Sequence, residues 1–72
     1  MPNKKIEFKI PGTYVHAIFE KIENNNWTMT IFNPSNKKGS IVEENMKTNL
    51  ARMMILKIMG QDFIDQCKER LT

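Results

Sequence analysis

The spacing of apolar residues changes along this sequence, and that change limits the folds that the chain can adopt. Ahead of Asn33 the apolar residues tend to recur at every second position, which is typical of β-strands with one wet face. After Gly39 they recur with the period of 3.6 residues that indicates a helix. Strands followed by helices predict an α+β protein in which the helices pack on one face of an antiparallel sheet.

The strand half is predicted to contain three strands, at residues 5–10, 13–22 and 27–32. The first strand alternates apolar and charged residues and ends at the pair Pro11-Gly12. Three asparagines, residues 24–26, separate the other two strands, and asparagine tolerates the left-handed backbone of hairpin turns. We therefore expect a three-stranded antiparallel sheet in β-β-β order.

A hairpin loop of three residues gives the last two strands the most apolar common face. This register pairs Glu23 with Trp27 and places Phe19 opposite Ile31, whereas a two- or four-residue loop sets Glu20 against Ile31. The expected core face consists of Ile6, Phe8, Ile10, Val15, Ala17, Phe19, Met29 and Ile31. The opposite face, here called the open face, carries Tyr14, His16, Ile18, Ile22 and Phe32, with Thr28 and Thr30 between them.

The helical half is predicted to hold one long helix and one short C-terminal helix. Ser40 stands three residues before Glu43, which is the spacing of a capping box, so the long helix is expected over residues 41–59. Gly60 indicates a break, because glycine costs about 1 kcal/mol inside a helix. Asp62 can then cap the short helix.

Two adjoining apolar stripes run along the predicted long helix. The stripe expected to lie on the sheet contains Val42, Met46, Leu50, Met53, Met54 and Ile58. The second stripe contains Ala51, Ile55 and Met59. The short helix is expected to cover that second stripe with Phe63, Ile64, Cys67 and Leu71.

A chain of 72 residues has room for one core, so residues 1–72 are interpreted as a single α+β domain. The longest apolar run, residues 53–56, is far shorter than the roughly 20 residues that span a bilayer. The amino terminus lacks the apolar core of a secretion signal, and the one cysteine fits a reducing compartment. We expect a cytoplasmic protein without a membrane anchor.

The sequence contains no pattern typical of an enzyme. A glycine-rich phosphate loop, paired histidines at helical spacing and a nucleophile elbow are all missing. Cys67 falls on the apolar side of the last helix, where thiols are usually packing residues. We therefore predict a non-catalytic protein with no cofactor and no metal ion.

The open face is the best candidate for a contact surface. Apolar and aromatic groups cluster there on a face that is expected to be wet, and such clusters mark interaction sites. The predicted partner-binding residues are Tyr14, His16, Ile18, Ile22 and Phe32. The partner is another protein or a second copy, and a two-fold contact through this face predicts a homodimer. Frequent Ile, Lys and Asn indicate an AT-rich genome, such as that of a phage or mobile element.

Binding of nucleic acid is the alternative hypothesis, because the basic residues are concentrated in the sheet half. Residues 1–42 hold six lysines and three glutamates. Lysines interleaved with rings could contact phosphates and stack on bases. The candidate residues are Lys5, Lys9, Lys37 and Lys38. A net charge of +3 is small for this function, so the protein partner is favoured.

Overall fold

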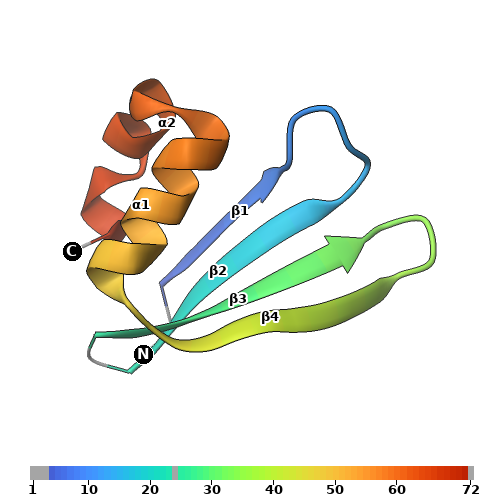
Figure 1. The fold of residues 1–72 in the computed structure, drawn as a ribbon, viewed down its shortest axis with the longest axis horizontal. Coiled ribbons are helices and arrows are strands. Elements are labelled where there is room, and N and C mark those ends of the chain that lie inside the picture. Colours follow the sequence, from blue (N-terminus) through green and yellow to red (C-terminus); the bar gives the residue numbers. More distant parts are fainter. Residues whose placement is uncertain (1–3, 24, 72) are drawn as a thin grey trace.

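The strands come first along the chain and the helices follow them, as Figure 1 shows for the computed structural model, which describes residues 4–23 and 25–71. The strands are β1 (Lys5–Lys9), β2 (His16–Glu23), β3 (Asn26–Asn33) and β4 (Lys38–Lys47). The helices are α1 (Thr48–Met59), α2 (Gln61–Gln66) and the 3₁₀ turn η1 (Lys68–Leu71).

All neighbouring strands are antiparallel, and the sheet order β1-β2-β3-β4 follows the chain. The helices gather on one face of this sheet (Figure 1). The structure thus confirms the predicted α+β class with an antiparallel sheet and two α-helices. It corrects the number of strands, because the sheet has four and not three.

The fourth strand occupies the segment that was expected to begin the long helix, so that part of the prediction is wrong. Ser40 and Glu43 both lie in β4 and α1 begins at Thr48. Ile41 and Val42 are β-branched and fit a strand better than a helix. Pairing with β4 also provides hydrogen-bond partners along the second edge of β3.

The β2–β3 hairpin has a different register from the predicted one. Phe19 lies opposite Met29, not Ile31, and Glu23 pairs with Asn26, not Trp27. An irregularity between Lys21 and Glu23 and a tighter turn account for the difference. Because the displacement is two residues, every side chain keeps its predicted face. Asn24, part of the predicted turn, lies outside the described residues.

The core lies between the sheet and the helices. Trp27, which the predicted core face did not include, is among its largest fully buried side chains. Phe8 stacks on Phe19 with ring centroids 6.0 Å apart and meets Phe63 of α2 edge-on at 5.2 Å. The buried set is Ile6, Phe8, Ala17, Phe19, Trp27, Met29, Met46, Ala51, Ile55, Ile64, Cys67 and Leu71.

Part of the stripe that was expected to lie on the sheet is exposed instead. Ala51 and Ile55, from the second stripe, are fully buried, whereas Leu50 and Met53 from the first stripe are exposed. The change follows from the later start of α1, since the prediction extended the helical period back into β4. Met54 and Ile58 still pack on the edge of the core.

A non-local cap fixes the position where α1 begins. Lys47 is the N-cap residue and makes no side-chain capping bond. Instead, the backbone N–H of Thr48 donates to Oδ1 of Asn25 at 3.0 Å, from the β2–β3 turn. The indole N–H of Trp27 donates to Oγ1 of Thr48 at 2.9 Å. Both bonds tie the first residue of α1 to the sheet.

Gly60 separates the two helices, as predicted, with a positive φ of 90°. It is also the residue that precedes α2 as its N-cap, so the predicted capping role of Asp62 is wrong. Asp62 lies one residue inside the first turn of α2.

The substitution T48V is expected to destabilise the protein by about 1–3 kcal/mol, because it leaves the buried indole N–H of Trp27 without its acceptor. T48S is the matched control. It keeps the hydroxyl and should cost less than about 1 kcal/mol. Urea unfolding of both variants measures the difference. Equal stabilities would contradict the assigned role of the hydroxyl.

Candidate interaction surfaces

The open face of the sheet lies opposite the helices and carries most of the predicted partner-binding residues. His16, Ile18 and Phe32 are half-buried on this face, and Ile22 at the end of β2 is 48% exposed. His16 is paired directly with Phe32 across β2 and β3, and Ile18 with Thr30. The alternation of buried and more exposed positions in β2 and β3 therefore matches the predicted faces.

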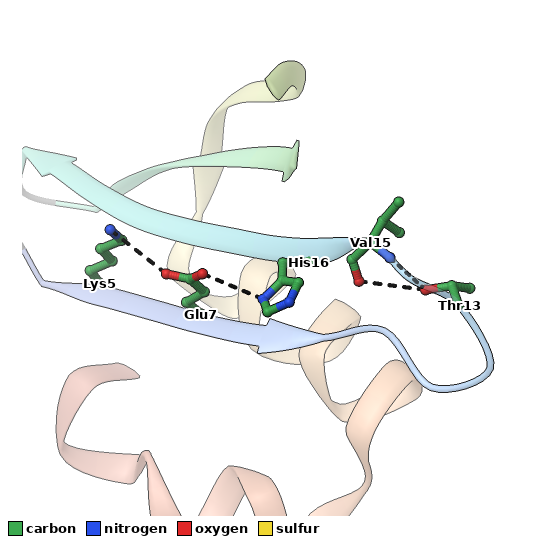
Figure 2. A network of polar contacts seen from close by, with 5 residues as sticks. All are labelled: Lys5, Glu7, Thr13, Val15 and His16. Carbon is green, nitrogen blue, oxygen red and sulfur yellow. Dashed lines mark hydrogen bonds and ion pairs between the residues drawn. The ribbon is translucent and has the colours of Figure 1, made fainter. Parts of the chain in front are cut away.

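Tyr14 lies apart from the rest of the predicted set. It is in the turn between β1 and β2 and is 82% exposed. Thr13 fixes this turn, because its hydroxyl donates to the carbonyl of Ile10 at 2.8 Å. The same hydroxyl accepts from the backbone N–H of Val15 at 3.2 Å (Figure 2). Tyr14 therefore lies in the turn beyond the paired strands.

A small polar network joins β1 and β2 on the open face. Figure 2 shows Glu7 between Lys5 and His16, with its carboxylate 3.9 Å from Nζ of Lys5 and 3.4 Å from Nδ1 of His16. The three side chains are partly exposed, so these contacts add little stability. These contacts hold His16 beside the carboxylate of Glu7 on the open face. The one thiol of the chain, Cys67, is buried on the other side of the sheet.

The open face is hollowed at the end nearer the β2–β3 turn. This concavity has a volume of about 390 Å³. Its lining combines three carboxylates and two isoleucines with amides and hydroxyls, and no lysine or arginine is among its residues. The lining residues are Glu20, Ile22, Glu23, Asn26, Thr28, Thr30, Ile41, Glu44 and Asn45.

Sequence reasoning found only part of this concavity. Ile22, Thr28 and Thr30 were placed on the correct face, but Ile41, Glu44 and Asn45 come from β4, which was not expected. Ile41 was the residue from which this strand could have been predicted. A β-branched residue next to Val42 favours a strand over the first turn of a helix.

The candidate nucleic-acid residues fall on both edges of the sheet. Lys5 and Lys9 are on β1, whereas Lys37 and Lys38 are at the start of β4, on the opposite edge. Three strand spacings, about 14 Å, separate these edges. Lys9 is paired with His16 across β1 and β2. The structure therefore brings one of the four lysines beside a ring of the open face.

Cys67 and His16, the one cysteine and the one histidine of the sequence, lie on opposite sides of the sheet. Cys67 belongs to the buried core under the helices, and its thiol donates to the carbonyl of Phe63 at 3.2 Å. Burial raises the pKa of the Cys67 thiol above its usual value, and the nearby Arg70 opposes this only in part. Among the described residues, no group of His, Cys, Asp and Glu side chains could hold a metal ion.

Comparison of the chain with protein-family models, curated proteins and solved structures gives no match. Within the described ranges, neither helix has the length and apolar character needed to span a bilayer. The class that the structure defines is therefore a small α+β protein with a four-stranded meander, helices on one sheet face and the other sheet face open.

The Cys67 thiol is expected to react slowly with a disulfide reagent such as DTNB at neutral pH, because burial disfavours the thiolate that attacks. The rate for the folded protein should be at least about tenfold below that of the same chain in denaturing urea. Stopped-flow absorbance measures both rates. A folded-state rate equal to the unfolded one would identify Cys67 as an accessible, reactive thiol.

Proposed function

We propose that this protein is a non-catalytic interaction module and that the open face of its sheet binds another protein. The observation that carries the proposal is the concavity on this face, where Ile22 and Ile41 are 48% and 61% exposed among polar groups. Exposed apolar side chains grouped with polar ones are the usual composition of a protein-binding patch.

The carboxylates of the concavity indicate the chemistry of the partner. Glu20, Glu23 and Glu44 line it without a lysine or arginine among the lining residues. A partner that presents a lysine or arginine next to apolar side chains would satisfy both the charge and the isoleucines. We therefore propose a basic and apolar segment of another protein as the ligand of this face.

The positions of the cysteine and the histidine support a binding role over catalysis by a thiol. The lone cysteine is buried under the helices and the lone histidine contacts Glu7 on the other side of the sheet. A thiol and a base separated by a sheet cannot form the hydrogen-bonded pair that activates a nucleophile.

Binding of nucleic acid remains the second candidate, because Lys9, His16 and Phe32 are neighbours in the register across β1, β2 and β3. The three carboxylates of the concavity oppose it, since they repel phosphates. A titration with single-stranded DNA and RNA at low and high salt separates the candidates. Micromolar binding that weakens steeply with salt would favour nucleic acid.

The substitution I22K is expected to reduce capture of the partner at least about tenfold, because it places a cation and a longer side chain at the rim of a site built for a basic ligand. M53K makes the same change at a residue of similar exposure, 56%, on the outer side of α1 and serves as the control. Affinity capture from the native host with tagged wild-type and variant proteins, quantified by mass spectrometry, compares them.

In this experiment wild type and M53K should retain the same captured protein and I22K should lose it. Circular dichroism verifies that all three proteins are folded. Retention by I22K, or loss with M53K alone, would place the contact away from the open face.

A further inference from the structure

The strand β4 forms an edge of the sheet and is the most exposed strand of the molecule. Among residues 4–23 and 25–71, only β3 pairs with it, and every residue from Lys38 to Asn45 is exposed. Ile41 and Val42 are 61% and 53% exposed in the middle of this stretch. An edge strand presents backbone N–H and C=O groups that can pair with another strand.

The charges along β4 are arranged with opposite signs on the two sides of this apolar pair. Lys37 and Lys38 precede it and Glu43 and Glu44 follow it. These four side chains form no salt bridge with the described part of the chain, although all are exposed. Their charges are therefore available to a partner.

This pattern is complementary to itself when the strand is reversed. Lys38 lies three residues before Ile41 and Glu44 lies three residues after it. Two antiparallel copies of β4 related by a two-fold axis near Ile41 place the lysine end of each copy beside the glutamate end of the other. Lys38, opposite Asn33, and Glu43, opposite Met29, are on the same side of the sheet and would be neighbours across the joint. Parallel pairing in register would instead oppose lysine with lysine and glutamate with glutamate, which is unfavourable.

We infer that β4 pairs antiparallel with β4 of a second copy of this chain, which joins two four-stranded sheets into one continuous sheet. The two-fold axis uses the same strand on both copies, so the assembly closes at two chains. Both open faces would lie on the same side of the joined sheet. Ile41 and Glu44 of β4 also line the concavity, so the joint would lie beside it, but the inference does not rest on the partner proposed for the open face.

The irregular backbone of β4 limits the strength of this contact. The β3–β4 register shifts between Trp27 and Met29 and again between Met29 and Thr30, and Asn45 has a positive φ of 57°. Bulges of this kind shorten the regular edge and protect edge strands from open-ended aggregation. A short paired stretch is a small interface, so we expect a Kd of about 10–100 µM.

Charge reversal at the two ends of β4 tests the inference directly. The variants K37E/K38E and E43K/E44K each place like charges together in the self-paired strand, and each should weaken the dimer at least about tenfold. An equimolar mixture of the two variants should form a heterodimer, because every reversed charge then meets an opposite one. M53K, on the outer side of α1, is the control and should dimerise like wild type.

Sedimentation equilibrium from about 10 to about 500 µM protein covers the expected Kd range and measures all of these species. Circular dichroism verifies that each variant is folded, and the variant I18K/F32K tests the open-face dimer that the sequence predicts. Restored association in the mixture supports pairing through β4. Three results would overturn the inference. These are a wild-type protein that stays monomeric at all concentrations, a dimer that survives either charge reversal, and a mixture of the two variants that stays monomeric.

Discussion

The hydrogen bond between the indole of Trp27 and the hydroxyl of Thr48 connects the two halves of this protein. Trp27 is fully buried in β3, and Thr48 is the first residue of α1. Because Asn25 also caps the first N–H of α1, the start of the helix is fixed against the β2–β3 hairpin at two points. The rotation of α1 then buries Ala51 and Ile55 and exposes Leu50 and Met53. With α1 and α2 committed to one face, the open face and the edge of β4 remain available for contacts.

Local patterns were sufficient to predict three of the four strands, but not the register of the β2–β3 hairpin. Strict alternation identified β1, and the period of two assigned the core faces of β1, β2 and β3, because that period depends only on neighbouring residues. The prediction failed where a distant contact decides the structure. Residues 41–47 have an acceptable helical pattern despite the β-branched Ile41 and Val42, and pairing with β3 decides in favour of a strand. Likewise, the boundary at Thr48 depends on Asn25 and Trp27, which are remote in sequence.

The candidate site was also predictable only in part. His16, Ile18, Ile22 and Phe32 were assigned to the open face from strand parity, and they lie there. Glu44 and Asn45 could not be assigned, since the prediction placed them in a helix on the other side of the sheet. The concavity and the self-complementary charges of β4 therefore became visible only when the fourth strand was known.

A concentration series of ¹⁵N–¹H correlation spectra would test most directly whether the exposed strands, and not the helices, make the contacts of this protein. The account predicts that resonances of residues 38–45 shift as the dimer forms. Resonances around Met53, an exposed apolar residue on the outer side of α1, should stay unchanged. Shifts confined to the outer side of α1, with β4 unaffected, would contradict the account.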